Sequence, residues 1–303
     1  MKQTITLAIF LVGIFLSTKG QNFKQQYKDL DSKNDTVAQL ELLQKWEAAD
    51  SSDPEMYVAY FNFYVSKSKR NMIEVGNNPK GENVLQLMDT DTTKKEPVAY
   101  MYDNTSYDPI FLKKGFDYAD KGISKNPTRL DIRFGKTYMF GELEDWKNFT
   151  AEIIKAIDYS ATIKNKWIWT DNNPVEGDPK EFMLSSIQSY QLQLYNTNND
   201  TLLDNMKQIA EEILKYYPEH VESLSNLSVV YMINKDYDKA LEQLLKAESF
   251  APTDFIVLNN IAEAYKRKGD NVSAIKYFDK VVKYGDVDAK ATAKEQINKL
   301  NKK

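Results

Sequence analysis

The sequence predicts an all-α protein built from antiparallel helix pairs, with one small β-hairpin inserted among them. Three observations predict this fold. The C-terminal third of the chain repeats itself, because residues 221–254 can be aligned with residues 255–288. Apolar residues recur every three or four positions along most of the chain, which is the spacing of one helix face. Clusters of Pro, Asn, Asp and Gly separate these periodic segments, as turns between helices require.

The alignment of the two C-terminal units brings equivalent residue types together. In both units, large and small apolar residues recur at helical spacing on either side of a turn-forming triplet. The small alanines predict a close approach between the two helices of each unit. The aligned positions include the pairs Leu224 and Leu258, Leu227 and Ile261, Tyr231 and Tyr265, Ala240 and Ala274, and Leu244 and Phe278.

These two units resemble the tetratricopeptide repeat, whose units of about 34 residues follow an L-G-x2-Y, A-x3-F and terminal Pro pattern. Ser228 and Ala262 replace its glycine, and Asp286 stands in the place of its last proline. A third unit at residues 128–161 contains Phe134-Gly135-Lys136-Thr137-Tyr138. The chain as a whole is similar to exported bacterial proteins of this family. The resemblance implies an α-solenoid, a right-handed superhelix of about five antiparallel helix pairs, and a role in binding proteins or peptides.

The remaining segments are assigned from the same patterns. Two segments interrupt the helical pattern. One contains two short apolar runs around a polar loop, which predicts a hairpin, and the other contains two tryptophans. In chain order the expected segments are a signal peptide at 1–20, an N-terminal helical region at 21–66, the insertion at 67–108, repeats at 109–163, the tryptophan loop at 164–179, a degenerate repeat at 180–220, the two clear repeats at 221–288 and a capping helix at 289–303.

The first twenty residues have the pattern of an export signal. Lys2 precedes a short apolar stretch, Ile5–Leu16, and small residues lead up to Gly20. Twelve residues extend only about 18 Å as a helix, too short for a hydrocarbon core of about 30 Å. We therefore expect cleavage after Gly20, no stable membrane insertion afterwards, and a soluble periplasmic or secreted protein. The alternative is an uncleaved N-terminal anchor.

Composition argues against several classes of function. The chain has no cysteine, its one histidine is His220, and 44 acidic residues outnumber 40 basic ones. Cysteine nucleophiles, thiolate metal sites, histidine triads and multi-histidine metal sites are therefore not expected. A nucleic-acid partner is not expected either, because such proteins usually carry a basic surplus. We predict a non-enzymatic protein with no metal or other cofactor.

Two short motifs nevertheless suggest chemistry. Asp89-Thr90-Asp91-Thr92-Thr93 has the D-x-D-x-T form of an aspartate-nucleophile phosphatase. That fold requires alternating strands and helices, so a polar hairpin loop is the favoured interpretation. The acidic stretch at residues 171–178 could be imagined as a calcium loop, but its glycine falls one place too late. His220 follows a proline in a turn, where an exposed or helix-capping histidine is expected.

In the repeat family, the first helix of each pair lines a groove that holds a peptide. Asparagine there can bind a ligand backbone through both its donor and its acceptor. Basic residues on the same face could hold a carboxylate, although an ordinary solvated helix face is an equal alternative. The predicted groove residues are Arg129, Arg133, Lys136, Asn226, Asn259, Asn260, Glu263, Lys266 and Arg267.

The sequence thus predicts an interaction scaffold that binds a protein or peptide in this groove. The second hypothesis is an accessory subunit of a cell-envelope complex. It would dock through aromatic residues of the insertions, namely Tyr100, Tyr102, Trp167 and Trp169, since tyrosine and tryptophan are favoured interface anchors. An enzyme with its site in residues 67–108 is the third.

Overall fold

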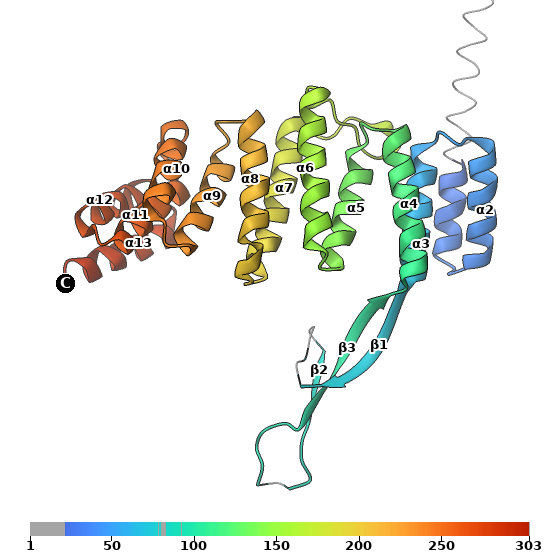
Figure 1. Cartoon of the computed structure of the whole chain (residues 1–303), viewed down its shortest axis with the longest axis horizontal. Helices are drawn as coiled ribbons and strands as arrows, with labels where there is room; N and C mark the ends of the chain where they lie inside the picture. Colours follow the sequence, from blue (N-terminus) through green and yellow to red (C-terminus); the bar gives the residue numbers. More distant parts are fainter. Residues whose placement is uncertain (1–21, 78, 80–82, 92, 303) are drawn as a thin grey trace, which may run out of the picture. The chain divides into compact units, whose positions relative to one another are not determined.

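The computed structural model describes residues 22–77, 79, 83–91 and 93–302 (Figure 1). The expected signal peptide at 1–20 lies outside the described residues. The chain divides into two compact units. The first unit holds the described residues up to Arg133 together with Trp169–Asn173, and the second holds Phe134–Ile168 and the described residues from Pro174 onward. Both units are largely helical, which confirms the predicted fold class.

The first unit combines helices with a small sheet. Its elements are a helix at residues 22–31, α2 (Thr36–Ala49), α3 (Pro54–Ser68), β1 (Lys69–Gly76), β2 (Val84–Leu87), β3 (Ala99–Tyr107), α4 (Pro109–Lys125), the first turn of α5 (Leu130–Glu142) and the short 3-10 helix η1 (Thr170–Asn172).

The second unit is a succession of helices. After the rest of α5 these are α6 (Trp146–Thr162), α7 (Pro179–Asn196), the 3-10 helix η2 (Asp200–Leu202), α8 (Leu203–Tyr216), α9 (Val221–Ile233), α10 (Tyr237–Phe250), α11 (Phe255–Lys268), α12 (Asn271–Tyr284) and α13 (Val287–Leu300). Among the described residues, no helix combines the length and the apolar character that a membrane crossing needs.

Aspartate side chains define where most of these helices begin. Asp53, Asp108 and Asp178 each precede a proline at the first helical position and accept hydrogen bonds from backbone N–H groups of the first turn. These N–H groups have no partner within the helix, so a capping carboxylate satisfies them. The same capping is provided by Asp35, Asp145, Asp236, Asp254, Asp270 and Asp286.

The main partner of α3 is α4, although the whole insertion separates them in sequence. α3 packs far more extensively against α4 than against α2. Buried glycines on α4 allow this close approach. A Cβ atom at Gly122 would lie 2.8 Å from the Cβ of Tyr57, and one at Gly115 would lie 3.5 Å from the carbonyl of Phe61. The insertion therefore replaces the turn inside one helix pair.

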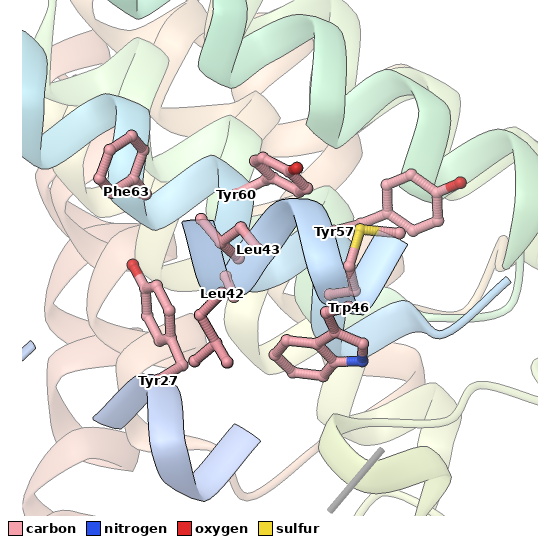
Figure 2. Close-up of a cluster of buried hydrophobic side chains, with 9 residues drawn as sticks. Tyr27, Leu42, Leu43, Trp46, Tyr57, Tyr60 and Phe63 are labelled. Atoms are coloured by element: carbon pink, nitrogen blue, oxygen red, sulfur yellow. The ribbon is translucent and has the colours of Figure 1, made fainter. Parts of the chain in front are cut away.

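Aromatic side chains form the core of the first unit (Figure 2). Trp46 of α2 has no exposed surface and stacks on Phe23 of the helix at 22–31. Tyr60 of α3 stacks on Tyr118 of α4, with ring centroids 3.9 Å apart. Tyr27 brings the helix at 22–31 into the same cluster as Trp46. The helix at 22–31 thus packs with α2, as α3 does with α4.

The inserted sheet has three antiparallel strands in the order β1-β3-β2. The predicted hairpin is confirmed by β2 and β3, in which Leu87 pairs with Ala99. The sequence analysis missed β1, which pairs with β3 from Lys69, opposite Tyr107, to Gly76, opposite Tyr100. Its sequence, KRNMIEVG, lacks the alternation of apolar and polar residues that marks a half-buried strand, and seven of its eight residues are exposed.

The C-terminal repeats pack as their pattern predicts. Leu224 of α9 and Ile261 of α11 share one buried cluster with Leu244 and Ala247 of α10. A second cluster joins α11, α12 and α13, and the terminal helix contributes Ala293 and Leu300 to it. Equivalent turns link the helices of each pair, since Lys235 and Gly269 occupy the same position of the repeat and both have positive φ, 62° and 91°.

Candidate functional site: an amide-bearing helix face

Amide side chains lie at matching levels on α7, α9 and α11 of the second unit. Asn226 on α9 and Asn260 on α11 are equivalent positions, because they coincide when the two C-terminal repeats are aligned. Both are half-exposed, as are Asn259 beside Asn260 and Gln188 on α7. We call Gln188, Asn226, Asn259 and Asn260 the amide face.

Two members of the amide face bind each other. Asn226 Nδ2 donates to Gln188 Oε1 at 2.7 Å, and Gln188 Nε2 donates to Asn226 Oδ1 at 3.3 Å. This reciprocal pair joins α7 to α9 and fixes the orientation of both amides. Each amide keeps a second N–H and a second oxygen lone pair, because a primary amide has two of each. Sequence analysis missed Gln188, since the repeat around it is too degenerate to align with Asn226.

The charged residues predicted on α11 are partly engaged within the chain. Lys266 Nζ lies 2.5 Å from Glu263 Oε1 and donates to Gln296 Oε1 of α13 at 3.2 Å. Arg267, one residue further on, is exposed at the end of the helix. Among the predicted charges of α11, Arg267 is therefore the most exposed.

Arg129 does not lie on an exposed face, and its predicted role in the groove is wrong. Its side chain has no exposed surface. The guanidinium donates to Glu55 at 2.7 Å, to both carboxylate oxygens of Asp131 at 2.7 and 2.8 Å, and to Asn172 Oδ1 at 3.2 Å. A buried cation needs such partners, because desolvation without them is very costly. Arg129 is a structural residue of the first unit.

The same correction applies to Arg133 and Lys136, which are 8% and 6% exposed. The Arg133 guanidinium donates to the carbonyl of Pro127, and Lys136 Nζ lies 3.1 Å from Glu152 Oε1. Burial alone would raise the pKa of Glu152, but hydrogen bonds from Lys155 and Lys136 outweigh burial and lower it. The three basic residues predicted around α5 therefore serve packing and do not form a solvated stripe.

Two of the four aromatic residues proposed for docking are buried. Trp167 is 2% exposed and packs against Tyr159, and Tyr102 on β3 is 6% exposed. Docking through these two side chains is therefore wrong, because a partner could not reach them. Tyr100 and Trp169 are half-buried.

The tryptophan loop places η1 against the helices of the first unit. Lys24 Nζ lies 2.6 Å from Asp171 Oδ1 and 2.7 Å from Glu55 Oε2, and the N–H of Asp171 donates to Glu55 Oε1 at 2.7 Å. Burial would raise the pKa of Glu55, but Lys24, the Asp171 N–H and Arg129 lower it. A cavity of about 620 Å³ opens beside this cluster, with Trp46 in its lining.

His220 caps α9, as its position in a turn predicted. Its Nδ1 accepts the N–H of Ser223 at 3.2 Å, and its Nε2 lies 3.2 Å from Glu222. Burial lowers the pKa of His220, so the neutral ring that accepts this hydrogen bond is favoured. The one histidine of the chain is thus occupied in helix capping.

The acidic motif of the insertion forms a turn of the hairpin loop. Asp89 accepts the N–H of Asp91 at 3.0 Å and contacts Lys94 Nζ at 2.6 Å, and Asp91 accepts the N–H of Thr93. These are local contacts within an exposed loop. Across the residues that the structure describes, no three His, Cys, Asp or Glu side chains are grouped closely enough to hold a metal ion.

The comparison with protein families agrees with the repeated geometry. Residues 221–254 and 256–284 each match the model of the tetratricopeptide repeat. These are the α9–α10 and α11–α12 pairs, which carry Asn226 and Asn260. The α9–α10 and α11–α12 pairs are therefore tetratricopeptide repeats.

Solved structures of this fold class are distantly similar to the chain. PilW, a widely conserved type IV pilus biogenesis factor, is 10% identical with a TM-score of 0.39, covering 90% of this chain and 97% of PilW. YrrB, a repeat protein with an unusual peptide-binding site, is 13% identical with a TM-score of 0.31, covering 90% of each chain.

A repeat protein from Parabacteroides merdae is 14% identical with a TM-score of 0.35, covering 89% of this chain and 81% of that one. Similarity at this level says nothing about what the present chain binds. The comparison with curated protein sequences gave no match.

Proposed function

We propose that the chain is a non-enzymatic scaffold whose amide face binds an extended segment of a partner protein. The observation that carries this proposal is the reciprocal Gln188–Asn226 pair with Asn260 at the equivalent level on the next repeat. Such amides suit a peptide backbone, since each offers both a donor and an acceptor. An extended peptide presents the same two groups at every residue.

The spacing of the helices fits this mode of binding. Neighbouring packed helices lie about 8–10 Å apart, and an extended peptide rises about 3.3 Å per residue. One amide on each of α7, α9 and α11 would therefore meet the peptide backbone at about every third residue. Arg267 at the end of α11 would add a contact to an acidic side chain or a C-terminal carboxylate of the peptide.

A peptide selection tests the proposal directly. A phage-displayed library of random dodecapeptides would be selected on the chain, and a selected peptide would be titrated by fluorescence anisotropy. We expect Asn260→Ala to weaken binding about fivefold to tenfold, because each lost hydrogen bond contributes about 1 kcal/mol. Asn298→Ala, which removes an exposed amide from α13, is the matched control.

Equal affinities for wild type, Asn260→Ala and Asn298→Ala would reject the amide face as the binding site. The second hypothesis, docking through aromatic loops, has weaker support because Trp167 and Tyr102 are buried. The docking hypothesis could still hold through Trp169 and Tyr100. In that case Trp169→Ala would reduce partner binding and Asn260→Ala would not.

We also propose that the scaffold acts after export, in the periplasm or outside the cell. The support is the basic and apolar pattern of residues 1–20. Intact mass spectrometry of the protein purified from its host should show a chain that begins at Gln21. A mass that includes residues 1–20 would favour the N-terminal anchor.

A further inference from the structure

The outer edge of β1 is free to pair with another strand. In the described part of the chain, β1 pairs with β3 on one side and with no strand on the other. Figure 1 shows β1 continuing from the end of α3 and β3 leading into α4, with the sheet extending away from these helices. Met72, Ile73 and Val75 are 48%, 68% and 55% exposed.

Such an edge is unusual for a protein that stays unpaired. Natural sheets protect their edge strands with charged side chains, prolines, bulges or very short length, and of these devices β1 has only the charges of Lys69, Arg70 and Glu74. β1 has eight residues and no proline, and its register with β3 runs without interruption from Lys69 to Gly76. Its exposed middle is apolar. These features favour strand addition to this edge.

The charges on β1 indicate which strand would be added. We propose that β1 pairs in antiparallel fashion with β1 of a second copy of this chain, around a twofold axis at Met72. In this register Arg70 lies directly opposite Glu74 of the second copy, and Glu74 lies opposite Arg70 of the second copy. Directly opposite residues of unlike charge stabilise an antiparallel pair, and like charges destabilise it.

Arg70 and Glu74 are both accessible for pairing with the second copy. Arg70 is half-exposed, with its nearest carboxylate, Asp108, at 3.7 Å. Glu74 is exposed and accepts a hydrogen bond from Asn104. A register with its axis at Ile73 would instead place Glu74 opposite Met72 and Arg70 opposite Gly76. The charges therefore select the axis at Met72 over this alternative.

The proposed pairing extends one apolar surface. Strand alternation and the observed register place Ile73, Val75, Met101 and Leu85 on the same face of the sheet. Joining two β1 strands would give a continuous antiparallel sheet in the order β2-β3-β1-β1-β3-β2. Such a twofold interface uses the same surface on both copies, as closed dimers do. The proposed dimer does not depend on the amide face, because the amide face lies on α7, α9 and α11 and the dimer uses the edge of β1.

A charge-exchange experiment tests both the partner and the register. The oligomeric state of the full chain, produced with its own N-terminal segment, would be measured by sedimentation equilibrium. We expect a dimer that Arg70→Glu or Glu74→Arg alone weakens at least about tenfold, since each change creates two like-charge pairs. Lys95→Glu, in the exposed hairpin loop, is the control and should leave the dimer unchanged.

Mixing the two weakened variants gives the decisive result. A mixed dimer of Arg70→Glu with Glu74→Arg restores unlike charges at both contacts, so dimerisation should return when the two are combined. Recovery in the mixture is expected only when residue 70 of one copy faces residue 74 of the other. A wild-type chain that stays monomeric, or a mixture that stays monomeric, would overturn the proposal.

Cysteine cross-linking checks the axis without changing charge. The chain contains no cysteine, so single substitutions report on one position at a time. Met72 would lie opposite its own copy, within the Cα separation of about 4.4–6.8 Å that a disulfide needs, whereas Val75 would lie opposite Lys69. Met72→Cys should therefore form disulfide dimers under mild oxidation and Val75→Cys should not. Equal cross-linking of both, or cross-linking of Val75→Cys alone, would contradict the register.

Discussion

Arg129 and Glu55 form an ion pair of 2.7 Å, although the Arg129 side chain has no exposed surface. The two residues belong to the start of α5 and the first turn of α3, and Asp131 shares the same guanidinium. Lys24 reaches Glu55 from the helix at 22–31, and Asn172 of η1 reaches Arg129. This cluster therefore connects most of the helical segments of the first unit.

Removal of the Arg129 guanidinium should destabilise this unit strongly. We expect Arg129→Met to lower the free energy of unfolding by about 3–5 kcal/mol, because Glu55 and Asp131 would stay buried without their cation. Arg267→Met, at an exposed position, should change it by less than about 0.5 kcal/mol. Urea denaturation of both variants measures the difference. Similar stabilities for the two variants would mean that the buried cluster makes no net contribution to the free energy of unfolding.

The lowered pKa of Glu55 predicts an acid sensitivity of definite sign. The folded state holds this carboxylate ionised, so the unfolded state binds more protons at acid pH and stability falls as the pH falls. The contribution is fully present above about pH 4.5 and is lost below it. The difference in unfolding free energy between wild type and Glu55→Gln should therefore shrink between pH 6 and pH 3.5. A constant difference across this range would contradict the assignment.

The turns of the two C-terminal repeats allow a matched pair of substitutions. Lys235 and Gly269 occupy equivalent positions with φ of 62° and 91°, a region that costs an L-residue about 1–2 kcal/mol. Lys235→Gly should raise the free energy of unfolding by about 1 kcal/mol, and Gly269→Ala should lower it by about as much. Thermal denaturation tests both, and a change of the same sign in the two variants would exclude backbone strain as the cause.

The contact between Gly122 and Tyr57 tests the pairing of α3 with α4. A Cβ atom at position 122 would lie 2.8 Å from the Tyr57 Cβ, so one helix has to move. We expect Gly122→Ala to lower the free energy of unfolding by about 1–3 kcal/mol, despite the better helix propensity of alanine. Ser124→Ala, exposed on the same helix, is the control. A neutral or stabilising effect of Gly122→Ala would show that the two helices do not approach so closely.

Much of the fold could be predicted because the information is local. The helix pairs at Leu224–Ala247 and Leu258–Val281 follow from apolar residues at helical spacing and from the alignment of one unit with the next. The hairpin of β2 and β3 follows from two short apolar runs. The position of His220 after Pro218 in a turn predicted an exposed or a helix-capping histidine, and the residue caps α9.

The pairing of α3 with α4 could not be predicted from local patterns, because the inserted sheet separates them. The assignment of Arg129 to the groove was wrong because its partners Glu55 and Asn172 are also distant in sequence. Glu55 is 74 residues away, and no local pattern around Arg129 marks a buried cation. Gln188 was missed because its contact with Asn226 spans 38 residues across a degenerate repeat. Long-range polar contacts thus decide which predicted groove residues remain available.

The most direct test of the central proposal is photo-cross-linking in a growing culture of the host, with cells and medium both analysed. A photoreactive amino acid would replace Asn260 on the amide face or Asn298 on α13, and cross-linked peptides would be identified by mass spectrometry. The proposal predicts that position 260 reacts with one continuous segment of a partner protein, in much higher yield than position 298. Equal yields at the two positions, or reaction at position 298 alone, would contradict peptide binding by the amide face.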